Sequence, residues 1–159
     1  DGEAGTAGYD LNLIINFKSL GTLLITTEGG MGGNGASGKT GPSGLNGSMN
    51  EADGGRGENG GKGGNGGNGG NILLHYWSDN FLISFATAKT NQHLIKFNYS
   101  GGRPGLGGDG GRGGRAGEPI ISLNSSITGV RGKEGLSGTK GNNGLPGLDG
   151  ELFLKRLTN

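Results

Sequence analysis

The chain has 159 residues, of which 42 are glycine, and its formal net charge at pH 7 is +1. Cysteine is absent, which excludes disulfides and thiolate metal sites, and only 29% of the residues are hydrophobic. The near-zero net charge gives no electrostatic footprint for nucleic acid, and no apolar run reaches the roughly 18 residues that a membrane-spanning helix needs.

The predicted elements alternate along the chain between glycine-rich blocks and short apolar runs. The glycine blocks cover residues 2–8, 29–47, 54–70, 101–117 and 129–150. The apolar runs between them predict β-strands near residues 11–17, 22–27, 71–77, 81–87, 93–99, 119–123 and 151–157. The first two runs are expected to form a hairpin and the next three a meander. No segment has the periodicity of an α-helix.

Within each block, glycine stands at every third residue, and this spacing is the main structural signal of the sequence. A period of three with a high glycine content is typical of left-handed extended helices of the polyproline II type, which have three residues per turn and no internal hydrogen bonds. Their backbone N–H and C=O groups must therefore bond to neighbouring segments or to water.

Two kinds of packing satisfy such backbone groups, namely the collagen triple helix and the polyglycine II lattice, in which helices of one chain lie side by side. Only four prolines occur, far fewer than a collagen needs. The blocks 54–70 and 101–117 also contain glycine doublets, and a second glycine per triplet only adds entropic cost to a collagen. We therefore expect a lattice, with the doublet blocks inside it and the single-glycine blocks 29–47 and 129–150 at its edge, their polar residues in solvent. A collagen-like trimer and a disordered chain are the alternatives.

The expected fold is thus mainly β, with a small sheet linked to packed polyglycine II helices and without α-helix. We expect residues 1–159 to form a single glycine-rich domain. Because the chain starts at Asp1 rather than at methionine, we expect it to be a fragment of a longer protein.

The stretch GNGASGKT matches the phosphate-binding loop G-x-x-x-x-G-K-[ST]. Such a loop needs a hydrophobic strand directly before it and an α-helix directly after it. Here the strand ends near Thr27, and the sequence GPSGLNGS that follows cannot start a helix. We interpret Gly33, Gly38, Lys39 and Thr40 as a chance match within the glycine register, and we expect neither a nucleotide site nor an enzyme.

Candidate binding residues lie at a turn and in loops that interrupt the repeat. The aromatic residues of this region are expected first of all to cover the sheet as its core. The ring of Trp77, at a predicted strand end beside the polar turn 78–80, is also a candidate for stacking on a sugar or a partner. Loops can vary without disturbing a lattice, so specificity is expected there. The candidate ligand-binding residues are Trp77, Asp79, Asn80, Asn50, Glu51, Asp53, Lys89, Asn91 and Gln92.

The remaining polar residues give no sign of catalysis. The only histidines, His75 and His93, lie within predicted strands and have no nearby acidic pair. The carboxylates Asp109, Glu118, Asp149 and Glu151 are expected to keep the glycine blocks soluble. We therefore expect no catalytic residue, no metal and no cofactor.

The stretches GGKGGNGGNGGNILLHY and GGDGGRGGRAGEPIISL resemble two groups of glycine-rich proteins. One comprises the tip adhesins of phage long tail fibres and kindred collagen-like bacterial surface proteins, in which glycine helices hold loops that recognise bacterial receptors. The other is the N-terminal glycine-rich domain of Obg-type GTPases, which touches ribosomal RNA. The resemblance is one of pattern over the four long blocks and transfers no functional residue. The lack of basic excess argues against the Obg-type group.

The first resemblance implies a non-enzymatic adhesion or receptor-binding module that is extracellular or displayed at a surface, with a cell-surface glycan or protein as its partner. An Obg-like accessory domain and a purely structural spacer are the alternatives. An ice-binding slab is disfavoured by the charged triplet positions and by the lack of a flat Thr/Ala face. No nucleic acid and no membrane insertion are expected, while a homotrimer or association with a fibre stays open.

Overall fold

The computed structural model describes residues 1–47, 52–85, 93–120 and 130–158, and within these ranges it contains six β-strands and no α-helix. The chain divides into two compact units. The glycine unit comprises Asp1–Glu3, Gly33–Gly64 and Gly105–Gly144, and the strand unit comprises Ala4–Gly32, Asn65–Pro104 and Leu145–Asn159. All six strands belong to the strand unit, and the prediction of a mainly β fold without α-helix is confirmed for the described residues.

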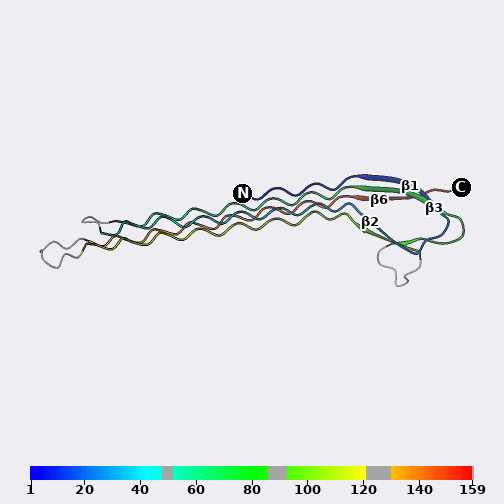
Figure 1. The fold of residues 1–159 in the computed structure, drawn as a ribbon. Helices are drawn as coiled ribbons and strands as arrows, with labels where there is room; N and C mark the ends of the chain where they lie inside the picture. The colour runs from blue at the N-terminus through cyan, green and yellow to red at the C-terminus, as the bar shows by residue number, and fades with distance from the viewer. Residues whose placement is uncertain (48–51, 86–92, 121–129, 159) are drawn as a thin grey trace. The chain divides into compact units, whose positions relative to one another are not determined.

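The strands form two parallel three-stranded sheets (Figure 1). The first sheet has the order β1-β3-β6, with β1 at Leu11–Phe17, β3 at Ile72–Ser78 and β6 at Leu152–Arg156. The second has the order β2-β5-β4, with β2 at Thr22–Thr26, β5 at Leu94–Asn98 and β4 at Ser84–Phe85. In the first sheet Leu11 is paired with Ile72, and Ile72 with Leu152.

The predicted hairpin and meander are wrong, because β1 pairs with β3, β2 pairs with β5, and β4 lies parallel to β5. The cause is that every strand except β4 directly adjoins a glycine segment whose neighbour is already fixed. Gly8 donates its N–H to the Asn68 carbonyl at 2.8 Å, and the same alignment runs on into the pairing of Leu11 with Ile72. The predicted strand 81–87 is reduced to β4 among the described residues. The predicted strand 119–123 is described only to Ile120, with a single bridge at Pro119.

The core lies between the two sheets. Ile72 and Leu74 of β3 are fully buried, and they form one cluster with Phe17 of β1, Ile25 of β2 and Ile95 of β5. Burying one such side chain stabilises the fold by about 1.5–3 kcal/mol. Half-buried aromatic rings surround the cluster, which assigns Tyr76, Phe81, Phe85, Phe97 and Tyr99 to the core. The sheets therefore pack face to face.

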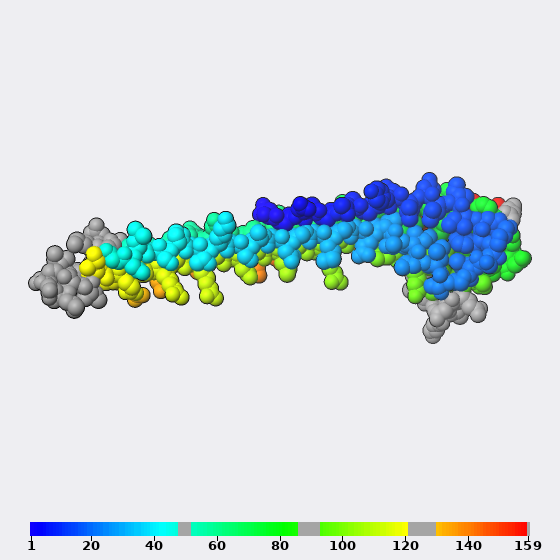
Figure 2. Space-filling model, in the orientation of Figure 1, coloured from blue at the N-terminus to red at the C-terminus, as the bar shows by residue number. Residues whose placement is uncertain are grey.

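Apart from the strands and the short stretches beside them at 18–21, 79–83, 93 and 157–158, the described chain consists of five extended segments, named here G1 to G5. They cover residues 1–10 (G1), 27–47 (G2), 52–71 (G3), 99–120 (G4) and 130–151 (G5). In each unit, glycine N–H groups at every third residue donate to carbonyl groups of a neighbouring segment. Gly35 of G2, for example, donates to Leu106 of G4 at 2.8 Å. Figure 2 shows G1, in dark blue, lying along the lighter blue G2.

The segments differ in how many neighbours they bond. In each unit, G3 is bonded to the other four segments, G2 and G4 to three each and G5 to two. Among the described glycines, five of G3 and seven of G4 are buried, against three of G2 and one of G5. The glycines of the doublet blocks are thus buried more often than those of the single-glycine blocks, which is the direction predicted.

The doublets follow from close approach on two sides. A Cβ atom on Gly66 would collide with the Gly102 carbonyl of G4, and one on Gly67 with the Thr6 carbonyl of G1. Both are backbone obstacles that no side-chain rotation removes. Each glycine of a doublet therefore faces a different neighbouring segment.

Candidate functional site

The phosphate-loop match lies on the extended segment G2. Gly35 and Gly38 donate their N–H groups to the carbonyls of Leu106 and Asp109 at 2.8 Å, and no helix occurs among the described residues that follow Thr40. Lys39 is exposed, and its N–H lies 3.3 Å from a carboxylate oxygen of Glu58. The N–H groups of Gly35 and Gly38 are thus bonded to a neighbouring segment.

The structure brings three of the nine predicted binding residues together. Asn50, Glu51, Lys89, Asn91 and Gln92 lie outside the described residues. Asp53 belongs to the glycine unit, where its Oδ1 accepts the Lys133 N–H at 2.7 Å. Trp77, Asp79 and Asn80 lie together in the strand unit, at and just beyond the end of β3.

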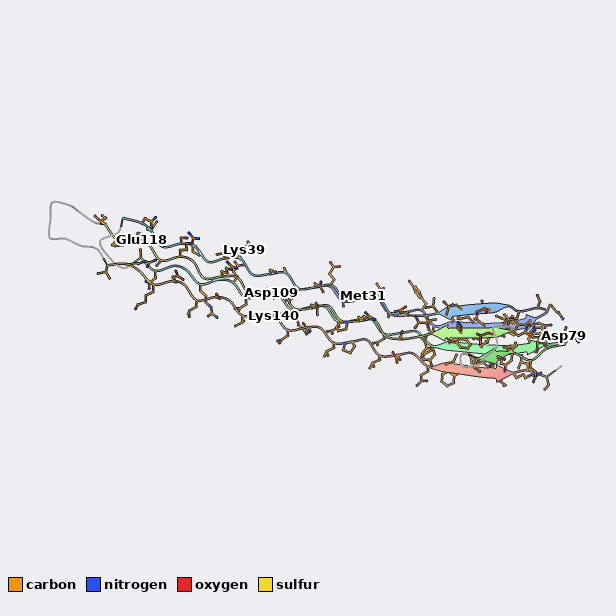
Figure 3. All side chains as sticks on the ribbon, turned by 90° about the horizontal axis from the view of Figure 1, so that it is seen from below. Met31, Lys39, Asp79, Asp109, Glu118 and Lys140 are labelled. Carbon is orange, nitrogen blue, oxygen red and sulfur yellow. The ribbon has the colours of Figure 1, made fainter. Side chains whose placement is uncertain are left out.

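A shallow, open pocket lies where β3 and β6 end. Its lining combines Trp77, Ser78 and Asp79 with Arg156, Leu157 and Thr158. The parallel register pairs Tyr76 with Arg156, and the Leu157 N–H donates to the Tyr76 carbonyl at 2.7 Å, so the two strand ends stay together. Figure 3 shows Asp79 at this end of the strands. The carboxyl ends of neighbouring parallel strands commonly form binding crevices.

The pocket is lined by both polar residues and an aromatic residue. Asp79 forms an ion pair with Lys18, whereas Arg156 is exposed and has no ion-pair partner among the described residues. The Ser78 hydroxyl donates to the Phe81 carbonyl at 2.5 Å, which holds the turn after β3. Asn16 stands opposite Trp77 in the register, and its buried Oδ1 has no hydrogen-bond partner in the described structure. Trp77, Arg156 and Thr158 thus line one open space.

Sequence reasoning missed Arg156, Leu157 and Thr158, which complete this pocket. The predicted meander placed β3 beside its neighbours in the sequence, whereas the observed sheet places it beside β6. The available signal was the apolar run 151–157, which directly follows a glycine block just as β3 does.

Asparagine and aspartate residues of the glycine segments have a structural role that the sequence analysis also missed. Asn65 Oδ1 accepts the Leu145 N–H at 2.9 Å, and the next residue, Gly66, donates its N–H to the carbonyl of the same Leu145 at 2.8 Å. We call this two-bond arrangement an Asx clamp. Asx clamps start at Asp1, Asp10, Asn34, Asn46, Asp53, Asn59, Asn65, Asn68 and Asn71.

Three of the four carboxylates that were expected to keep the glycine blocks soluble also bond to a neighbouring segment. Asp149 Oδ1 accepts the Gly101 N–H at 2.8 Å. Asp109 of G4 forms an exposed ion pair of 3.4 Å with Lys140 of G5 (Figure 3). Glu118 of G4 forms a second exposed pair of 3.4 Å with Arg131 of G5. Exposed pairs of this kind contribute about 0–1 kcal/mol. The polar residues of G2 and G5 are mostly exposed, but several of them also join neighbouring segments.

No family model and no curated protein matches the chain. Among solved structures, it has 20% identity to the springtail antifreeze protein from Granisotoma rainieri, described as a nine polyproline type II helical bundle whose crystal waters match the ice lattice. That match covers 100% of this chain and 98% of the other, with a TM-score of 0.13, which is too low to carry an argument. Within the described ranges, no helix has the length and apolarity to cross a membrane, and no group of three or more potential ligands is placed to hold a metal ion.

Proposed function

We propose that this protein is a non-enzymatic adhesion or receptor-binding module, extracellular or displayed at a surface, built on a lattice of polyglycine II helices. The lattice is supported by glycine at every third residue and by the hydrogen bonds from these glycines to neighbouring segments. Such a lattice uses its backbone polar groups for bonds between its own segments. We therefore expect a ligand to be bound by side chains at the ends of the segments and strands.

The observation that carries the binding function is the pocket beside Trp77. An indole has a large apolar face, and it loses little conformational entropy when it is covered by a ligand. Arg156 and Thr158 add hydrogen-bond donors, and Asp79 adds an acceptor, within the same open space. A ligand with one apolar face and a polar edge fits this set, and the pyranose ring of a cell-surface glycan has that character. A polar protein loop is the other candidate partner.

Binding to glycan arrays and to whole cells tests the proposal. Trp77→Ala is expected to weaken binding at least about thirtyfold, the effect of losing a contact worth about 2 kcal/mol at a binding hot spot. Phe153→Ala is the matched control, because Phe153 is a 52% exposed aromatic residue of the same sheet outside the pocket. Thermal unfolding would show that both variants fold. No binding by the parent protein, or equal binding by both variants, would contradict the proposal.

A purely structural spacer is the second candidate function. It is favoured by the continuity of the hydrogen bonding, which joins the glycine segments in both units. A protein that binds no cell and no glycan, yet unfolds cooperatively at high temperature, would support the spacer over the adhesion module.

A further inference from the structure

All six Asn-Gly dipeptides of the sequence lie in the glycine segments, at Asn34, Asn46, Asn59, Asn65, Asn68 and Asn143. Asn-Gly is chemically labile because the glycine side chain offers no obstacle to ring closure. The glycine nitrogen attacks the asparagine Cγ, ammonia leaves, and a succinimide ring forms. Water then opens the ring to give aspartate or isoaspartate, so that the net reaction consumes water and releases ammonia.

Both reacting groups are engaged at every one of the six sites. The glycine N–H donates to a carbonyl of another segment at 2.8–3.0 Å. The asparagine Oδ1 accepts a backbone N–H of another segment at 2.9–3.0 Å. At Asn65, for example, ring closure requires Gly66 to release the Leu145 carbonyl and the side chain to release the Leu145 N–H.

We infer that hydrogen bonding between the segments suppresses deamidation, and that these six asparagines become covalent modification sites only when the segments separate. The attacking nitrogen must lose its proton and turn toward Cγ, and in the folded protein that proton is directed at a neighbouring carbonyl. Freed segments lose this restraint. The chemical state of the asparagines therefore records how often the segments have opened.

The two products have different consequences for refolding. Aspartate keeps the Oδ acceptor, and Asp1, Asp10 and Asp53 already start Asx clamps of the same form. Isoaspartate instead routes the backbone through the side chain and adds one backbone carbon. The added carbon shifts the later glycines of the same segment out of line with their carbonyl partners. Aspartate is therefore compatible with the segments, and isoaspartate prevents their realignment.

The first test compares folded protein with protein unfolded in urea, at the same mildly alkaline pH and the same temperature, by peptide mapping and mass spectrometry. The unfolded chain is expected to deamidate at all six sites at similar rates. The folded protein is expected to react at least about tenfold more slowly at each site, which corresponds to about 1.4 kcal/mol of added barrier. Equal rates in the two states would overturn the inference.

The second test removes one bond. Leu145→Pro deletes the N–H that Asn65 accepts but keeps the carbonyl that Gly66 uses, and proline suits an extended backbone. Deamidation of Asn65 is expected to rise about fivefold relative to Asn68, the ratio for a net hydrogen bond of about 1 kcal/mol.

The matched control for this second test is Leu136→Pro. Leu136 is also an exposed leucine of G5, and its carbonyl accepts the Gly57 N–H. The residue before Gly57 is Arg56 rather than asparagine or aspartate, so no clamp is present there. We expect this variant to leave all six rates unchanged. Equal rates at Asn65 and Asn68 in Leu145→Pro, or the same acceleration in the control, would overturn the role of the clamp.

Discussion

Gly67→Ala tests whether the glycine segments are in direct backbone contact. The new Cβ atom would collide with the carbonyl oxygen of Thr6, a backbone atom that no rotamer change can move aside. The alanine can be accommodated only if G1 moves away from G3. Such a movement breaks the bonds from Gly5 to Asn65, from Gly8 to Asn68 and from Gly30 to Thr6.

The expected loss of stability follows from these three bonds. At about 1 kcal/mol of net stabilisation per hydrogen bond, the free energy of unfolding falls by about 3 kcal/mol. For a chain of this length each kcal/mol lowers the melting temperature by about 2–4 °C, so we expect a decrease of about 6–12 °C. Urea and thermal unfolding followed by circular dichroism would measure both quantities.

Gly21→Ala is the matched control, because a Cβ atom on Gly21 meets nothing within 4 Å. There the same substitution restricts mainly the unfolded chain, and we expect stability to be unchanged or to rise by about 0.4–1 kcal/mol. If Gly67→Ala were as stable as Gly21→Ala, the close packing of G1 on G3 would be refuted.

Two further predictions concern the Asx clamps. Lys62→Asn should complete a clamp on Asn142, because the Asn142 carbonyl already accepts the N–H of the residue after Lys62. We expect this variant to raise the free energy of unfolding by about 1 kcal/mol. Lys39→Asn is the control, because position 39 precedes no glycine and the variant should not gain stability; equal melting temperatures for these two variants would count against the clamp. Asn68→Ala removes the acceptor for the Leu148 N–H and should cost about 1 kcal/mol, whereas Asn68→Asp should cost little because aspartate keeps the acceptor. Equal losses in these two variants, measured by urea unfolding, would show that the amide acts in some other way.

Five of the six strand positions were predictable because these strands are apolar runs that adjoin a glycine block, whereas β4, which adjoins none, is much shorter than predicted among the described residues. The prediction of residues 11–17 agrees with β1, and 151–157 lies within a residue of β6 at each end. Strand pairing was not predictable from short connections. The hairpin rule assumes that a short turn chooses the partner, whereas here the hydrogen bonds of G1 with G3 align β1 with β3 before any turn is reached.

The candidate site was accessible to sequence reasoning only in part. Trp77 and Asp79 could be chosen because an aromatic residue stands beside a polar turn. Arg156 and Thr158 join them only through the parallel register of β3 and β6, and nothing local to either residue indicates that contact.

The sequence by itself determined the triplet register, the positions of the strands and the division between inner and outer glycine segments. These properties depend on where the smallest side chain stands, because only glycine leaves room for another backbone. The tertiary structure alone decided which segments bond to which, in which direction, and which asparagines accept a neighbouring amide. The physical reason is that an extended segment has no hydrogen-bond partner within itself, so its partners lie on other segments. The sequence shows that such partners are needed, but it does not show which segments supply them.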